Sequence, residues 1–159
     1  MFIDHSKYQL KWQSINQGAL MPHRATEDAI GFDVYAPSDG VIPNDSSVVK
    51  IGLGFKAALP KGFGGFLIPR SGLATKSGVI LANIVGLIDP DYRGEWILAV
   101  TCHGDDYVYY KAGDRLAQFA ILPALLCEVR RVQDLDATSR GEGGFGSTDG
   151  IETMGLLTK

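Results

Sequence analysis

The chain has 159 residues, of which 45% are hydrophobic and 21% are charged; its net charge is −3 at pH 7 and its pI is near 5.5. This length predicts one globular domain, and the acidic balance argues against a protein that binds duplex DNA regardless of sequence. No apolar run approaches the roughly 18 residues of a membrane span, and MFIDHSKYQL lacks the apolar stretch of a secretory signal. We therefore expect a cytoplasmic protein, or one that works in a host's cytoplasm if it is viral.

Short β-rich runs, separated by glycine and proline, follow one another along the chain. In order they are YQLKW, GFDVYA, SVVKIGLGF, FGGFLIP, GVILAN, EWILAV, DYVYY, LAQFAIL and LLCEVRRV. Residues 49–55 alternate apolar with charged or small side chains, which is the period of a half-buried strand. Many short, evenly spaced strands predict an all-β sandwich or barrel. One helical turn around SGLATK is the most helix that we expect.

Two other features complete this outline. Cys102 and Cys127 lie in apolar, strand-like segments, which predicts two reduced core thiols and not a disulfide or a metal pair. From about residue 137 the chain has few apolar residues and no strand pattern. We therefore expect a β domain over residues 1–139 and a flexible arm over residues 140–159.

The arm begins with RGEGGFGSTDG, residues 140–150, which has five glycines in eleven positions. Too few residues follow for a dinucleotide-binding fold, and a Walker A loop would need lysine where Ser147 stands. A solvated tail remains one interpretation. The other is an arm that closes over a nucleotide, because Arg140 can bind phosphate, Phe145 can stack on a base, and Ser147 and Thr148 can donate hydrogen bonds.

Three earlier segments contain groups that such an arm could close upon. PRSGLA (69–74) combines an arginine, a hydroxyl and bare glycine backbone, which suits a phosphate nest but also an ordinary surface turn. In AGDRLAQ (112–118), Asp114 and Arg115 are expected to pair with each other. GLIDPDYRGEW (86–96) has a turn at residues 89–91 between two apolar runs, which predicts a β-hairpin.

Together, five segments resemble the five ordered motifs of the trimeric dUTP pyrophosphatases, or dUTPases. They are GFDVYA (31–36), PRSGLA (69–74), NIVGLIDPDYRGEW (83–96), AGDRLAQ (112–118) and RGEGGFGST (140–148). The resemblance implies a jelly-roll-like fold, a homotrimer with shared active sites, and Mg²⁺-dependent hydrolysis of dUTP to dUMP and pyrophosphate. That reaction limits uracil in DNA and supplies dUMP for thymidylate synthesis. Neither nucleic acid nor membrane is an expected partner, and a phage-type member of the family can also bind a regulatory protein.

The resemblance also implies roles for the matching residues. Asp89 would be the general base that activates water against the α-phosphorus, and Asp33 would act through water around Mg²⁺, which the substrate phosphates would hold. Tyr92 would lie under the deoxyribose, and the backbone near Asn83 would pair with uracil. The remaining residues would bind the substrate, from the β domain Arg70, Ser71, Gly72 and Gln118, and from the arm Arg140, Phe145, Gly146, Ser147 and Thr148.

Some positions depart from the family pattern, and two other functions remain open. His103, where relatives often have a nearby asparagine, is expected to be an exposed loop residue, and Asp149 adds negative charge near the γ-phosphate. A dCTP deaminase would need glutamate where Ala99 stands and favours a larger aromatic in place of Tyr92, so both positions favour a pyrophosphatase. A nucleotide-responsive protein-binding module would hold dUTP without releasing pyrophosphate.

Overall fold

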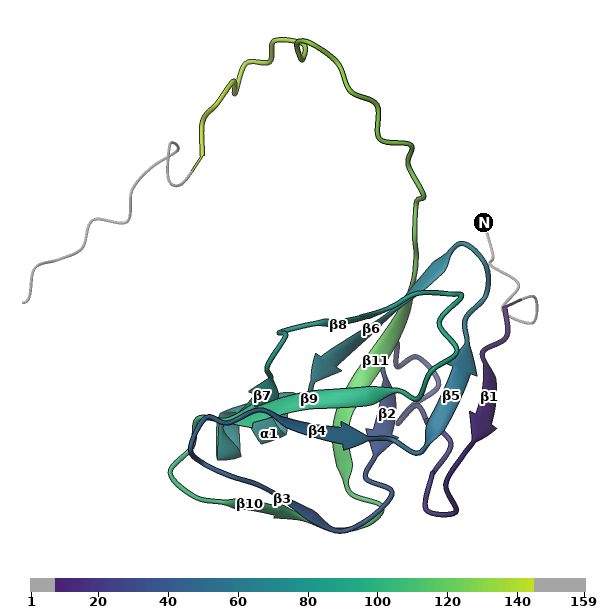
Figure 1. Ribbon diagram of the computed structural model, residues 1–159, viewed down its shortest axis with the longest axis vertical. Helices are drawn as coiled ribbons and strands as arrows, with labels where there is room; N and C mark the ends of the chain where they lie inside the picture. The colour runs from purple at the N-terminus through teal and green to yellow at the C-terminus, as the bar shows by residue number, and fades with distance from the viewer. Residues whose placement is uncertain (1–7, 145–159) are drawn as a thin grey trace, which may run out of the picture. The chain divides into compact units, whose positions relative to one another are not determined.

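The computed structural model describes residues 8–144, which form eleven strands and one short helix (Figure 1). The elements are β1 (Lys11–Ser14), β2 (Phe32–Tyr35), β3 (Gly40–Ile42), β4 (Val49–Gly52), β5 (Phe55–Ala58), β6 (Phe63–Pro69), α1 (Ser71–Ser77), β7 (Val79–Leu81), β8 (Gly86–Ile88), β9 (Ile97–Cys102), β10 (Val108–Tyr110) and β11 (Arg115–Pro123). The predicted all-β fold class is therefore confirmed. No helix among these residues has the length and hydropathy to cross a membrane.

The strands pair into two larger sheets and two ribbons, all antiparallel. One sheet has the order β2-β11-β6-β8 and the other has β4-β9-β7, while β1 pairs with β5 and β3 pairs with β10. Most of these neighbours are far apart in the sequence. Such crossed connections between antiparallel strands are those of a jelly roll and not of a simple meander.

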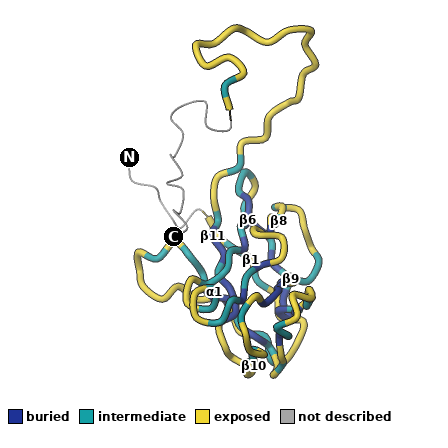
Figure 2. Tube along the Cα trace, turned by 90° about the vertical axis from the view of Figure 1, so that its left-hand side faces the viewer, coloured by how far each residue is buried: buried dark blue, intermediate teal, exposed yellow. Residues whose placement is uncertain are grey.

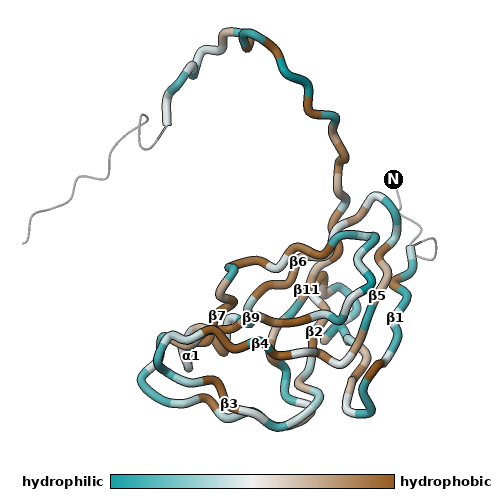
Figure 3. The backbone as a smooth tube through the Cα atoms, viewed as in Figure 1, coloured by the Kyte–Doolittle hydropathy of each residue, from teal (hydrophilic) through white to brown (hydrophobic). Residues whose placement is uncertain are grey.

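The core is aromatic at its centre and aliphatic around it. Trp96 is fully buried, and its ring centroid lies 5.0 Å from that of Phe119 and 5.3 Å from that of Phe55. Figure 2 shows burial concentrated on the strands of the two sheets, and Figure 3 shows β9 as an apolar strand. Because both sheets contribute to this core, the ends of their strands are held in fixed positions.

Four local predictions are wrong. The segment after Pro69 forms a helix of seven residues and not a single turn, and it ends where Gly78 takes a left-handed φ of 67°. The run LLCEVRRV forms no strand, since β11 ends at Pro123, and Cys127 is exposed whereas Cys102 is buried. Residues 49–55 form two strands and not one, because the backbone turns at Gly54, where φ is 72°.

The chain divides into two units after Leu126. In the second unit, of which residues 127–144 are described, the backbone N–H of Gly141 donates to Thr138 O and Oγ1, both at 3.1 Å. Arg140 Nε donates to Gly143 O at 2.9 Å. The arm that we predict from residue 140 onward remains a prediction.

Candidate active site

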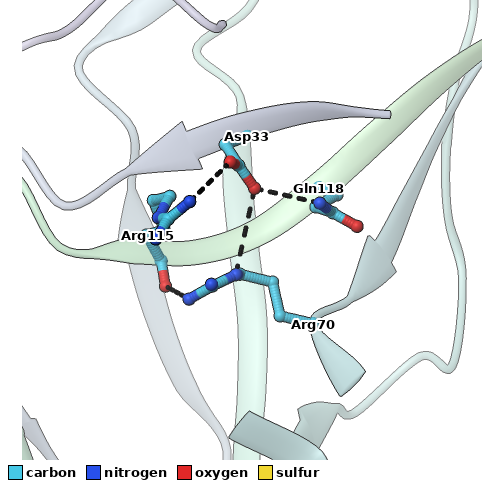
Figure 4. Close-up of polar contacts among 4 residues, drawn as sticks. All are labelled: Asp33, Arg70, Arg115 and Gln118. Atoms are coloured by element: carbon cyan, nitrogen blue, oxygen red, sulfur yellow. Dashed lines mark hydrogen bonds and ion pairs between the residues drawn. The ribbon is translucent and has the colours of Figure 1, made fainter. Parts of the chain in front are cut away.

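Asp33 gathers three side chains around one carboxylate, two from β11 and one from the residue that precedes α1 (Figure 4). Gln118 Nε2 donates to Asp33 Oδ1 at 3.0 Å, Arg115 Nη1 lies 3.3 Å from Oδ2, and Arg70 Nε lies 3.9 Å from Oδ1. Arg70 Nη1 also donates to the Arg115 carbonyl at 2.8 Å. We call these four residues the Asp33 cluster. The Asp33 side chain is only 4% exposed, so the carboxylate serves mainly to hold its partners.

Arg115 was not predicted as a site residue, and its expected pairing with Asp114 is wrong. Asp114 Oδ2 instead accepts a 2.7 Å hydrogen bond from the Lys111 backbone N–H. Residues three apart on a regular strand face opposite sides, so Arg115 and Gln118 should not both reach Asp33. They do so because the pairing register of β11 with β2 shifts between Arg115 and Ala117. Nothing in the sequence marks this bulge.

The cluster adjoins the start of α1. Arg70 is the N-cap residue, with extended backbone angles and no side-chain hydrogen bond to the cap. Helix starts leave backbone N–H groups without helical partners, and these groups suit an anion. A Cβ built on Gly72 would meet nothing within 4 Å, so packing does not require glycine there. The predicted residues Arg70, Ser71, Gly72 and Gln118 therefore lie in one region, in which Arg70 and Arg115 are the positive charges and Asp33 and Asp114 the negative ones.

A second concavity brings together the other predicted residues of the β domain. It has a volume of about 250 Å³ and is lined by Leu67, Asn83, Gly86, Leu87, Ile88, Asp89, Tyr92, Glu95 and Ile97. We call it the Asp89 pocket. One pocket therefore holds the predicted base Asp89, the predicted sugar-contacting ring Tyr92 and the predicted uracil-pairing residue Asn83. In the lining of the same pocket, a Cβ on Gly86 would lie 3.0 Å from Leu67 Cβ.

The turn after β8 is held by its own backbone. The N–H of Tyr92 donates to Asp89 O at 3.1 Å, and its hydroxyl donates to Glu95 O at 3.0 Å. A Cβ on Gly94 would overlap the Tyr92 hydroxyl, so the ring keeps this position only while residue 94 is glycine. The predicted hairpin does not form, because β8 pairs with β6 whereas β9 pairs with β4 and β7.

The other end of the Asp89 pocket is held by a strained turn. Ile84 has a left-handed φ of 64°, which is rare for a β-branched residue, and its side chain is 77% exposed. The Val85 N–H donates to Asn83 O at 2.6 Å across it, closing a three-residue γ-turn. Strained backbone of this kind is often found at functional sites.

The Asp33 cluster and the Asp89 pocket lie apart within one chain. Asp33 is on β2 and Asp89 follows β8, and these are the two edges of the four-stranded sheet. Three strand spacings of about 4.8 Å separate such edges by roughly 14 Å. Asp33 and Ile68 both pair with Gln118, whereas Asp89 follows Ile88, which pairs with Gly65. Asp33 and Asp89 are therefore also displaced from each other along the strand direction.

Several other predictions concern residues near or outside these regions. His103 is exposed after β9, as predicted, and its Nδ1 lies 3.2 Å from Ser46 Oγ. Within residues 8–144, no three His, Cys, Asp or Glu side chains gather as metal ligands. The predicted arm residues Phe145, Gly146, Ser147 and Thr148, together with Asp149, lie outside the described residues.

Comparison with known proteins agrees with the motifs. A family model described as dUTPase matches residues 17–149. The chain is 41% identical over 129 residues to a deoxyuridine 5'-triphosphate nucleotidohydrolase of Shigella sonnei, covering 79% of this chain and 85% of the relative. For the enzyme of that name from Syntrophotalea carbinolica, identity is 39% over 142 residues, covering 87% and 95%.

Solved structures share the fold at lower identity. The dUTPase of Staphylococcus bacteriophage 80alpha superimposes with a TM-score of 0.77 at 23% identity, covering 89% of this chain and 98% of that one. The dUTPase of phage phi11 of S. aureus, described with a structural Mg(II) ion, gives a TM-score of 0.72 at 21% identity, covering 79% and 97%. With its five motifs, its jelly-roll strands and these relatives, the chain belongs to the dUTPase family.

Proposed function

We propose that this protein hydrolyses dUTP to dUMP and pyrophosphate. The observation that carries the proposal is the Asp89 pocket, in which a carboxylate, an aromatic ring and an asparagine line one small concavity. Family membership and the names of the relatives support the same reaction. A deaminase is less well supported, because Ala99, where it would need glutamate, has no side chain that could transfer a proton.

Three residues of the Asp89 pocket have a proposed role. Asp89 accepts a proton from the water that attacks the α-phosphorus, which requires the water to lie within hydrogen-bond reach of its carboxylate. Tyr92, held by Glu95 O and by the space above Gly94, packs against the deoxyribose and leaves no room for a 2′-hydroxyl. The backbone at Asn83, fixed by the turn at Ile84, pairs with the uracil edge.

The Asp33 cluster and the start of α1 bind the phosphate chain of the substrate in this proposal. Arg70, Gln118, Ser71 and the Gly72 backbone bind its oxygens, and Arg115 adds charge. Mg²⁺ usually keeps several waters and binds through substrate phosphates, and we propose the same arrangement for this protein. When bound, Mg²⁺ would neutralise negative charge on the phosphates. Both Asp33 oxygens already face nitrogen donors, so we propose that Asp33 positions Arg70 and Gln118.

We further propose that the active site is shared between copies in a homotrimer. One substrate must reach both Asp89 and Arg70, yet Ile88 pairs with Gly65 whereas Arg70 follows Pro69 at the far end of β6, roughly 16 Å further along the strand at about 3.3 Å per residue. The outer face of that sheet is also apolar, since Leu87 is 63% and Leu122 is 43% exposed on the face that carries Gln118. A second copy that covers this face would bring its Asp89 pocket toward the first copy's arginines.

The remaining parts of the proposal concern the arm and the setting. The arm, with Arg140, Phe145, Gly146, Ser147 and Thr148, closes over the substrate, with Phe145 stacked on uracil. The free nucleotide substrate suits a protein of the cytoplasm, or of the host cytoplasm for a viral chain. Phage 80alpha dUTPase is described as controlling transfer of virulence genes. A regulatory protein partner is proposed here only for a phage origin.

A turnover assay tests the reaction. Pyrophosphate release is measured with dUTP, dCTP, dTTP and UTP, each with and without Mg²⁺. We expect release from dUTP alone, and only with Mg²⁺. Ammonia release from dCTP would favour the deaminase, and tight dUTP binding without pyrophosphate would favour the binding module.

A mixing experiment tests the shared site. Arg70→Ala and Asp89→Asn chains should each be nearly inactive alone, because each lacks one half of every site. After joint refolding, some sites pair an intact Asp33 cluster with an intact Asp89 pocket, so activity should return. Mixtures that stay as inactive as their parents would place the whole site in one chain.

A further inference from the structure

A third concavity lies on another part of the β domain and is strongly basic. It has a volume of about 290 Å³ and is lined by Lys11, Trp12, Gln13, Lys56, Ala57, Ala58 and Arg93. We call it the basic pocket. It shares no lining residue with the Asp89 pocket and includes no member of the Asp33 cluster. None of the roles described above uses it.

The pairing of β1 with β5 explains why the basic side chains converge. In the antiparallel register Gln13 is opposite Lys56, and Lys11 is opposite Ala58. Directly opposed residues, and residues two apart on one strand, share a face, so Lys11, Gln13 and Lys56 lie together. The small Ala58 leaves space between them. Trp12 and Ala57, on the opposite face, pack toward the core.

No carboxylate offsets these charges among the described residues. The pocket lining contains no Asp or Glu, and Lys11, Lys56 and Arg93 take part in no ion pair within residues 8–144. Three cations converge in a protein whose net charge is −3. Like charges held together repel, and an anion bound among them removes that repulsion.

Arg93 is fixed in a way that suits anion binding. Its Nη1 donates to Pro90 O at 2.8 Å and to Tyr92 O at 2.9 Å, which leaves Nε and Nη2 without a partner among the described residues. A guanidinium presents paired donors that match the oxygens of a phosphate group. Held by its Nη1 bonds, Arg93 needs little further ordering to bind one.

We propose that the basic pocket is a second, non-catalytic site for inorganic phosphate anions, with pyrophosphate as the best fit to three cations. Arg93 also connects this site to catalysis. The two carbonyls that it holds belong to the turn between Asp89 and Gly94, which carries the base and Tyr92. An anion that pulls on Arg93 therefore shifts this turn, so occupancy lowers turnover without competing with dUTP.

Binding is tested on protein whose active site is already filled. The full chain is saturated with the non-hydrolysable analogue α,β-imido-dUTP in a constant excess of Mg²⁺, and pyrophosphate is titrated by calorimetry. We expect one pyrophosphate per chain to bind. In the double variant Lys11→Gln, Lys56→Gln, affinity should fall about ten-fold or more, equivalent to at least 1.4 kcal/mol. Lys50→Gln is the matched control, an exposed lysine on β4 outside the pocket, and should bind normally.

The kinetic test separates binding from coupling. In the wild type, pyrophosphate should both lower kcat and raise the apparent KM for dUTP. In the double variant, pyrophosphate should raise the apparent KM for dUTP and leave kcat unchanged. The basal activity of the double variant should stay close to that of the wild type, because Lys11 and Lys56 neither line the Asp89 pocket nor belong to the Asp33 cluster. Arg93→Lys keeps the positive charge but loses the paired N–H donors of the guanidinium. This variant should therefore still bind pyrophosphate, but its kcat should not change when pyrophosphate binds.

Two results would overturn the proposal. One is no pyrophosphate binding to the analogue-saturated protein, and the other is equal binding by the wild type and the double variant. Failure of α,β-imido-dUTP to bind would instead count against the proposed reaction. In that case pyrophosphate titration of the free wild type and double variant still tests the basic pocket.

Discussion

Asp33 and Gln118 face each other across β2 and β11, and Gln118 Nε2 donates a 3.0 Å hydrogen bond to Asp33 Oδ1. This bond ties a residue of the proposed phosphate site to a carboxylate that is almost completely enclosed. The same carboxylate meets Arg115 and Arg70, so one buried charge sets the positions of three donors.

Asp33→Asn should therefore affect both stability and phosphate binding. Charge-assisted hydrogen bonds are lost, but the arginines still reach water, so we expect the free energy of unfolding to fall by about 1–3 kcal/mol. Urea unfolding measures this change. KM for dUTP should also rise, because Arg70 and Gln118 lose their orienting partner. A variant with normal stability and normal KM would show that Asp33 does not organise this cluster.

Asp89→Asn keeps the size of the side chain and removes its ability to accept a proton. Loss of a general base costs about 10²- to 10⁴-fold in rate, so kcat should fall by an amount within or beyond this range. The variant should still bind α,β-imido-dUTP. Asp91→Asn is the matched control, a carboxylate of the same turn that does not line the pocket. Equal activities for the two variants would remove Asp89 from the role of base.

Gly94→Ala tests how the Tyr92 ring is held. The new methyl group overlaps the Tyr92 hydroxyl, so the ring must move and its bond to Glu95 O must break. We expect KM for dUTP to rise and the preference for dUTP over UTP to narrow. Tyr92→Phe, which keeps the ring, should retain most of this preference. If Gly94→Ala discriminates like the wild type, another residue excludes the 2′-hydroxyl.

Ile84→Gly relieves the left-handed strain but allows the γ-turn other conformations. Glycine accepts this backbone freely, so thermal stability should stay the same or rise. The Asn83 backbone is then held less firmly, and KM for dUTP should increase while kcat changes little. Ile84→Val, which keeps the β-branch, is the control and should resemble the wild type. A fall in melting temperature with normal KM would instead give Ile84 a purely structural role.

The pair formed by Asp39 and Lys111 gives a pH dependence with a definite sign. Hydrogen bonds from the Ala112 N–H and the Lys111 ammonium lower the pKa of Asp39, and the bond to Asp39 raises the pKa of Lys111. The contribution of Asp39 is present above the ordinary carboxyl pKa and is lost as pH falls through the lowered value. That of Lys111 is present below the ordinary lysine pKa and is lost as pH rises through the raised value.

Asp39→Asn should thus lower the melting temperature slightly between about pH 4 and pH 10, the interval between the ordinary pKa values. Once the pH falls below the lowered pKa of Asp39, the variant and the wild type should converge, because the wild-type carboxyl is then also neutral. Melting curves from acid to alkaline pH measure the difference. A constant difference down to the lowest pH would mean that the charge of Asp39 contributes nothing.

The sequence predicted most of the strands and the order of the motifs, but not the pairing of distant strands. The strands around Phe32 and Phe119 follow from their β-rich composition, and the five motifs indicated the family. Whether β8 pairs with β9 or with β6 depends on contacts between distant segments, and the nearby turn at Asp89 suggested the wrong partner. Arg115 was missed because its direction depends on a bulge, and Cys127 because apolar composition alone does not place a residue in a sheet.

The separation of the Asp33 cluster from the Asp89 pocket has a consequence for how activity depends on protein concentration. On the proposed shared site, a chain that leaves its trimer keeps its own core around Trp96 but holds only incomplete sites. Activity per chain would then fall on dilution. Freshly synthesised chains would be inactive until their concentration was high enough for trimers to form. The onset of hydrolysis would be steeper than the rise in protein level, so assembly acts as a threshold for the chemistry.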